Sequence, residues 1–159
     1  MCHQFFNADL RKDEGSMYFY SMQSYDHPIT VQASDIDAMN HVNNVVYVQW
    51  VQDAAAAHWN AFAPSEIREK YNWVVLRHEI DYRNAAVLND QLIARTWVQS
   101  YAGVRSTRIV KIYRQRDEKL LVEAKTTWCL LTASNNRPAR VGDDITNTFV
   151  AASDSASDH

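Results

Sequence analysis

Residues 34–59 read SDIDAMNHVNNVVYVQWVQDAAAAHW, and no other stretch of the chain has side chains suited to a reaction centre at comparable density. Two carboxylates and several carboxamide and imidazole side chains lie within residues 35–44, and an apolar segment follows directly. A helix that begins there leaves its first backbone N–H groups without intrahelical partners, and these groups attract negative charge. One short segment can therefore supply both a carboxylate and a small oxyanion site.

Residues 42–62 are the one long helical candidate. Several valines in the first half have strand propensity, but the length and the four alanines at residues 54–57 favour a helix. Its large apolar side chains recur at spacings of three and four, which places them on one face: Tyr47, Trp50, Val51 and Ala54. We expect this face to pack against a sheet.

In most of the remaining sequence, apolar and polar residues alternate with a period of two. Residues 29–33 are a short strand candidate, and a short helix-like piece at 66–70 follows Pro64. Longer strands are predicted at 74–83, 92–100, 104–114 and 120–132, separated by turn signals. In the first of these the expected apolar face consists of Val74, Leu76, His78, Ile80 and Tyr82.

This element order predicts an α+β fold with one long helix packed on an antiparallel sheet of about five strands. A single helix covers only one face of such a sheet. The other face and the sheet edges must be solvated or paired with a second subunit. The element count therefore predicts a homo-oligomer, either a dimer or a dimer of dimers.

Composition narrows the class of protein. The 159 residues favour a single domain at 27–145, with an N-terminal extension at 1–26 and a tail at 146–159 that is expected to be disordered from 151. A net charge of −3 argues against a nucleic-acid partner. Two separated cysteines, no signal-like segment and no apolar run long enough to cross a membrane favour a cytoplasmic protein.

Only three glycines occur, so the sequence has no Walker loop, dinucleotide-binding fingerprint or nucleophile elbow. It also has no HExxH and no Cys–x–x–Cys motif. We therefore expect neither a cofactor nor a bound metal. Cys129 lies in an alternating apolar strand and is expected to be packed rather than nucleophilic.

The polar motif resembles that of the hotdog-fold acyl-CoA thioesterases, the group that includes 4-hydroxybenzoyl-CoA thioesterase and bacterial long-chain acyl-CoA thioesterases. The family pattern is Asp–x–Asp–x–x–x–His–Val–Asn–Asn–x–x–Tyr, and residues 35–47 meet every specified position. HEIDYRNAAVLND, residues 78–90, resembles the second strand of the family and its following turn. The resemblance implies a long helix wrapped by an antiparallel sheet, with active sites at the interface of paired subunits.

The resemblance also implies roles for single residues. Asp37 matches the catalytic carboxylate, as general base or as nucleophile, and the alternative is a turn or capping residue. Asn44 matches the position whose backbone N–H contacts the thioester carbonyl. Asn43 or Asn44 would also cap the helix. Asp35 points away from Asp37 if the segment is extended, so a structural role is expected for it.

Four further residues are candidates for substrate binding: His41, Asn43, Tyr47 and Arg105. A structural hydrogen bond is an equal alternative for His41, and a position in the core is the alternative for Tyr47. Arg105 belongs to a group of cations that could contact coenzyme A phosphates, together with Arg108, Lys111, Arg137 and Arg140. Most cations of this kind are simply solvated.

The sequence therefore predicts a thioesterase that hydrolyses acyl-CoA to a free acid and coenzyme A. One alternative is a non-catalytic hotdog protein that binds acyl thioesters. Another is a hotdog hydratase or dehydratase, whose differently spaced, glycine-containing motif is missing from this sequence.

Overall fold

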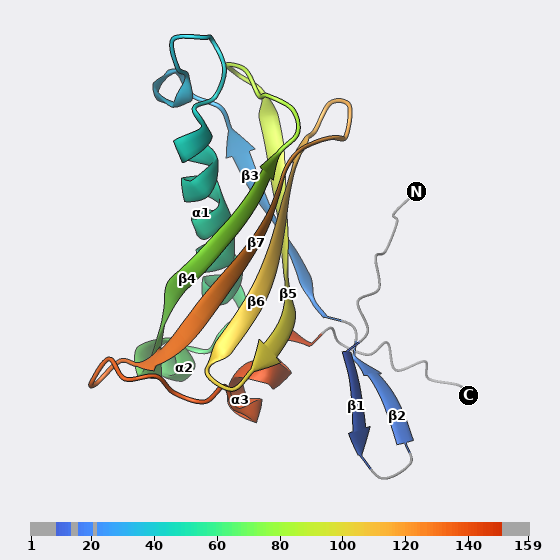
Figure 1. Ribbon diagram of the computed structural model, residues 1–159, viewed down its shortest axis with the longest axis vertical. Coiled ribbons are helices and arrows are strands. Elements are labelled where there is room, and N and C mark those ends of the chain that lie inside the picture. Colours follow the sequence, from blue (N-terminus) through green and yellow to red (C-terminus); the bar gives the residue numbers. More distant parts are fainter. Residues whose placement is uncertain (1–8, 14–15, 21, 151–159) are drawn as a thin grey trace.

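A five-stranded antiparallel sheet curves around one long helix, α1 (Asn44–Phe62) (Figure 1). In spatial order the strands are β3 (Ser24–Thr30), β5 (Gln91–Ala102), β6 (Arg105–Arg114), β7 (Lys119–Thr132) and β4 (Tyr71–Tyr82). The computed structural model describes residues 9–13, 16–20 and 22–150. The predicted α+β class, with one long helix on an antiparallel sheet of about five strands, is confirmed.

The remaining elements are short. β1 (Asp9–Asp13) and β2 (Ser16–Tyr20) form a separate two-stranded sheet. The others are η1 (Ala33–Asp35), α2 (Ser65–Lys70), α3 (Asp143–Thr146) and η2 (Asn147–Phe149). The expected disorder from residue 151 lies outside the described residues, and the division into extension, domain and tail stays a prediction. None of the helices in the described ranges is long and apolar enough to cross a membrane.

The sequence sets both ends of α1. The Asn43 side chain accepts a hydrogen bond from the Val45 N–H at 3.0 Å, which is how an N-cap residue satisfies a free helix donor. At the other end Pro64 disfavours the helical conformation for Ala63, whose ψ is 128°. The predicted apolar stripe is confirmed, since Tyr47, Trp50, Val51 and Ala54 are all buried.

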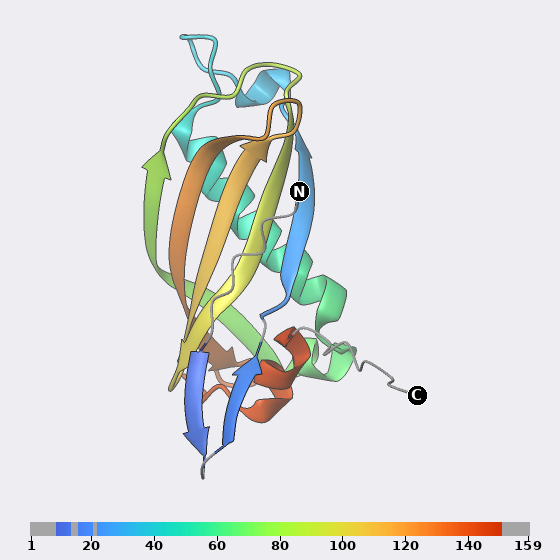
Figure 2. The same cartoon turned by 90° about the vertical axis from the view of Figure 1, so that its right-hand side faces the viewer.

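The main core lies between this stripe and the central strands. Fully buried aliphatic side chains from β6 and β7 face the helix: Val110, Ile112, Val122 and Ala124. A second cluster closes the carboxyl end of α1, where Phe149 stacks on Trp59 with ring centroids 5.7 Å apart. Figure 2 shows the segment that contains α3 against this end of the sheet. The carboxyl end of the helix is therefore packed against the C-terminal segment of the domain.

Strand β4 differs from the prediction because of a β-bulge. Leu76 has no partner in β7, since the register moves from Val75–Trp128 to Arg77–Thr127. A β-bulge adds one residue to a strand. Side chains that would share one face of the sheet therefore point to opposite faces before and after the bulge. Val74 and Leu76 therefore point outward and are 40% and 50% exposed, so the prediction of a single apolar face for this strand was wrong.

Strand β3 begins earlier than predicted. The prediction placed a strand at 29–33, whereas the observed strand is Ser24–Thr30 and Ala33 already belongs to η1. Pro28 lies inside this strand, which is possible because β3 is an edge strand that pairs only with β5 within the sheet. The expected domain boundary at residue 27 falls inside β3.

Candidate active site

The loop before α1 is held by Asp35. Its side-chain Oδ2 accepts a hydrogen bond from the Gln32 N–H at 2.8 Å, and its carbonyl accepts one from the Asn43 N–H at 2.9 Å. These bonds tie the two ends of the loop together. The structural role expected for Asp35 is confirmed.

Asp37 lies at the centre of a tight turn. Its N–H donates to the His41 carbonyl at 2.8 Å, and its Oδ1 accepts from the Met39 N–H at 2.8 Å and the His41 N–H at 3.4 Å. Asn40 has φ of 61°, a left-handed conformation that asparagine tolerates better than most residues. Within residues 22–150, no donor contacts the other oxygen, Oδ2, so this oxygen is free to bind a water molecule or a substrate.

This carboxylate lines a cavity of about 470 Å³ at the amino end of α1, which we call the Asp37 cavity. Asn44 lines the same cavity and is the first residue of the helix. Its backbone N–H has no intrahelical partner, and the described part of the chain offers it no other acceptor. The cavity thus combines a carboxylate oxygen and a backbone donor, and neither has a partner among the residues that the structure describes.

Two tyrosines form a wall of the Asp37 cavity. Tyr47 is 2% exposed, and its hydroxyl accepts a hydrogen bond from the Ala86 N–H at 3.0 Å. Burial raises the pKa of Tyr47 above its usual 10.0. This side chain is a core residue that also borders the cavity. Tyr82 from β4 packs edge-on against it, with ring centroids 5.7 Å apart.

The other candidates are distributed unevenly. His41 and Asn43 border the Asp37 cavity, with His41 exposed and the Asn43 side chain occupied as the helix cap. Arg105 begins β6 at the other end of the sheet, opposite Ala102 and Cys129, and does not border this cavity. Cys129 is buried, as expected.

Sequence reasoning did not assign a site role to Tyr82, Arg83 or Asn84, which also border the Asp37 cavity. All three lie within residues 78–90, the second segment that carried the family resemblance. Arg83 is a cation at this cavity, and it pairs with Glu123 at 3.3 Å while half exposed. The resemblance of residues 78–90 to the family therefore contains a signal for these three residues as well as for the strand and turn. Residues 22–150 contain no cluster of His, Cys, Asp and Glu suited to a metal ion.

A comparison with protein families matches residues 22–149 to the acyl-ACP thioesterase N-terminal domain. The chain belongs to this family. The resemblance to hotdog thioesterases is therefore confirmed. A sequence comparison with curated proteins returns no significant match.

Three solved structures are similar to this chain. A 1,4-dihydroxy-2-naphthoyl-CoA thioesterase from Synechocystis has a TM-score of 0.69 and 15% identity over 79% of this chain and 95% of its own. A Staphylococcus aureus protein solved in complex with CoA has a TM-score of 0.71 and 16% identity, covering 80% and 82%. The 12:0-ACP thioesterase from Umbellularia californica has a TM-score of 0.67 and 10% identity, covering 79% of this chain and 49% of its own. At these identities the likeness establishes the hotdog fold.

Proposed function

We propose that this protein hydrolyses acyl thioesters of coenzyme A in the Asp37 cavity. The observation that carries the proposal is the pair of unpartnered groups there, Asp37 Oδ2 and the Asn44 N–H. Membership of a thioesterase family supports it.

Asp37 serves as the group that starts the reaction. As a general base it removes a proton from water while the water oxygen attacks the thioester carbonyl carbon. As a nucleophile its own oxygen attacks instead, and water then cleaves the resulting mixed anhydride. In both routes the carbon–sulfur bond breaks, and the products are a carboxylic acid and a thiol.

Asn44 supplies the stabilisation of charge. The carbonyl oxygen becomes negative in the tetrahedral intermediate, and a fixed backbone donor lowers the energy of that state without reorganising. The amino end of α1 adds the positive end of the helix dipole. Because the donor is a backbone group, the asparagine side chain itself is not needed for this role.

Coenzyme A is the favoured thiol carrier. One similar structure is named as a CoA thioesterase and another was solved with CoA. Acyl-carrier protein is the alternative, since the matched family and the Umbellularia structure are named for it. Arg83 and His41 are placed to contact the carrier, because both border the Asp37 cavity and are exposed.

A second subunit would complete this site. Strand β4 is an edge strand that exposes Val74 and Leu76, and a long apolar edge favours pairing with another strand. Arg105 would help to bind the substrate of a neighbouring subunit and not the substrate of its own subunit, because it lies away from the Asp37 cavity of its own chain.

The test is thiol release from a panel of short, long and aromatic acyl-CoA thioesters, with the same acyl groups on acyl-carrier protein. We expect turnover of at least one acyl-CoA, with faster reaction on CoA than on the carrier protein. Binding of acyl-CoA without release of thiol would instead identify a non-catalytic binding protein. Hydration of an enoyl-CoA in place of hydrolysis would overturn the proposal.

A further inference from the structure

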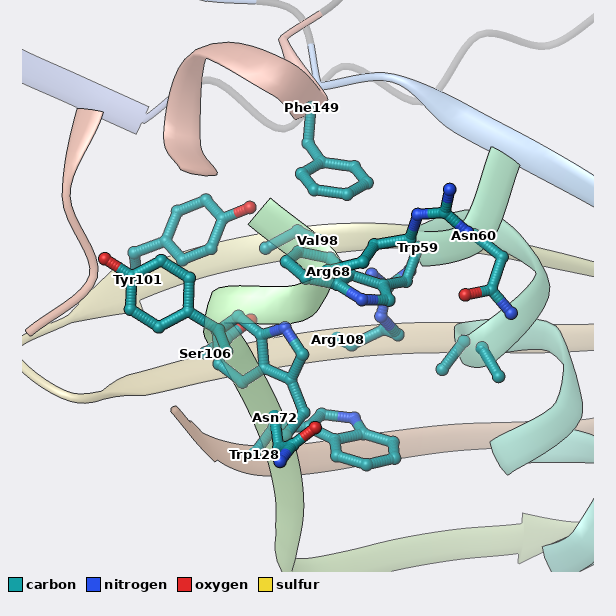
Figure 3. Close-up of a pocket in the computed structure, with 14 residues that line it drawn as sticks. Trp59, Asn60, Arg68, Asn72, Val98, Tyr101, Ser106, Arg108, Trp128 and Phe149 are labelled. Carbon is teal, nitrogen blue, oxygen red and sulfur yellow. The ribbon is translucent and has the colours of Figure 1, made fainter. Parts of the chain in front are cut away.

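A second cavity, of about 370 Å³, lies at the carboxyl end of α1, and we call it the Arg108 cavity. It shares no lining residue with the Asp37 cavity. The helix rises about 22 Å between Asn44, which borders one cavity, and Trp59, which borders the other. The walls are rich in aromatic side chains: Trp59, Tyr71, Trp73, Tyr101, Trp128 and Phe149. Figure 3 shows Arg108 among them.

Arg108 is only 7% exposed, so its guanidinium is largely removed from water. Its Nη1 donates to His58 Nδ1 at 2.8 Å and to Thr96 Oγ1 at 3.1 Å. No carboxylate within residues 22–150 lies at ion-pair distance from it. A buried charge without a counter-ion is costly, so its presence needs an explanation.

His58 cannot supply the missing negative charge. Burial, together with the neighbouring Arg108, lowers the pKa of His58 to about 3, so its ring is neutral at pH 7. Arginine only donates hydrogen bonds, so His58 Nδ1 is the acceptor and Nε2 carries the proton. Nε2 then donates to Gln23 Oε1 at 3.2 Å. Burial lowers the pKa of Arg108 to about 10, which leaves the guanidinium charged at pH 7.

Further donors in this cavity lack acceptors. The Tyr101 hydroxyl and the Trp128 Nε1–H are buried and have no hydrogen-bond partner within residues 22–150. Both hydrogen bonds of Arg108 use Nη1, which leaves Nε and Nη2 to donate elsewhere. Buried donors without acceptors are rare in folded proteins. Acceptor oxygens on a ligand bound in this cavity would provide partners for such donors.

We propose that the Arg108 cavity binds a carboxylate attached to an aromatic or long aliphatic group. The two oxygens of a planar carboxylate match the guanidinium edge formed by Nε and Nη2, and the aromatic walls hold the apolar part. Arg68 also borders the cavity but is exposed, so Arg108 is the one buried cation in its lining, and one buried cation suits one negative charge better than the two of a phosphate. The carboxylate belongs either to a free acid or to the far end of an acyl thioester, and this second source rests on the proposed function.

Calorimetric titration of the full chain with 2-naphthoate and decanoate tests this inference, with the two corresponding amides as uncharged controls. We expect both acids to bind at least tenfold more tightly than their amides. Arg108→Met should remove this preference, and Arg108→Lys should retain part of it because the charge remains. Equal affinity for acid and amide, or no binding of either acid, would overturn the proposal.

Tyr101→Phe and Trp128→Phe provide a readout that a structural role would not give. Each removes a donor that has no partner within residues 22–150. Tyr101→Phe removes only a hydroxyl, so its melting temperature should not fall, whereas Trp128→Phe also removes ring atoms and should lose some stability. Affinity for the acids should drop about tenfold in both variants, the usual effect of losing a hydrogen bond to a charged group. Unchanged affinity in both variants would contradict the assignment. These variants also serve as the test if Arg108→Met does not fold.

Kinetics separates the two sources of the carboxylate. A free acid that competes with acyl-CoA occupies the path of the acyl group, whereas one that binds without competing occupies an independent site. Asp37→Asn should bind the acids as the parent protein does. If acid binding is kept and no hydrolysis is found, the proposed function is wrong. If hydrolysis is found and the acids do not bind, the proposal for the Arg108 cavity is wrong.

Discussion

The hydroxyl of Tyr82 donates a hydrogen bond to the carbonyl of Asn44 at 3.1 Å. This bond joins the edge strand β4 to the first residue of α1, whose N–H is the proposed oxyanion donor. The position of that donor therefore depends on a residue 38 positions further along the chain.

Tyr82→Phe should lower the free energy of unfolding by about 1 kcal/mol, the usual net value of one hydrogen bond. The rate of thioester hydrolysis should fall several-fold because the end of the helix is held less firmly. Tyr113→Phe is the matched control, since this hydroxyl on β6 forms no hydrogen bond within the described ranges and does not border the Asp37 cavity. Equal loss of activity in both variants would show that the Tyr82 bond has no specific role.

Asp37→Asn should lower kcat by roughly 10²–10⁴-fold, the scale expected for a positioned base, with little change in substrate affinity. Asparagine has the same shape, and its amide oxygen can still accept the backbone hydrogen bonds of Oδ1. Asp35→Asn removes the same charge two residues away and should reduce stability rather than turnover. Full activity of the Asp37 variant on a substrate of the parent enzyme would make this carboxylate structural.

The stability of the protein should depend on pH through His58. Its pKa is about 3 in the folded chain, against 6.5 for an ordinary histidine, so the unfolded chain binds more protons between these values. Stability should therefore rise with pH across this window, by up to about 1.4 kcal/mol per pH unit, and level off above pH 6.5. Urea unfolding from pH 4 to pH 8 measures this slope.

His58→Gln should reduce that slope by the contribution of one group, while His41→Gln, at an exposed position, should leave it in place. If the His58 variant keeps the slope of the parent protein, the dependence comes from other groups.

The purified protein should be a dimer or a dimer of dimers. Sedimentation at micromolar concentration should give a mass above that of the 18.3 kDa chain. Lysine at both Val74 and Leu76 should shift the protein toward monomer, because charges on a sheet edge oppose strand pairing. If the unsubstituted protein sediments only as a monomer, the proposed site does not include a subunit interface.

The sequence was sufficient for the elements whose signals are local. The helix stripe, the tight turn at Gly103 with φ of 61° and the motif loop all follow from spacing or from turn residues. The bulge at Leu76 was not predictable, because it depends on the register with β7 and not on the residues of β4 alone. The early start of β3 was missed because the tolerance for Pro28 depends on its place at the sheet edge.

The candidate site, like the fold, was predictable from the sequence only in part. The residues of the motif itself line one cavity, as contiguous residues before a helix can. Arg108 was grouped with surface cations, although it alternates in phase with Val110 and Ile112, which are buried. That periodicity was a usable signal for burial. No sequence pattern could predict that its partner His58 is neutral, because His58 lies on a different element.

The carboxylate of Asp37 is oriented by main-chain donors, the N–H groups of Met39 and His41. The Met39 side chain contributes nothing to that orientation and is 76% exposed. The orientation of the carboxylate therefore does not constrain the side chain at position 39. Saturation mutagenesis at this position should yield active enzyme for most replacements. Proline is the exception, since it lacks the N–H. Descendants of this sequence can thus change the side chain beside the cavity while keeping the same backbone support for the Asp37 carboxylate.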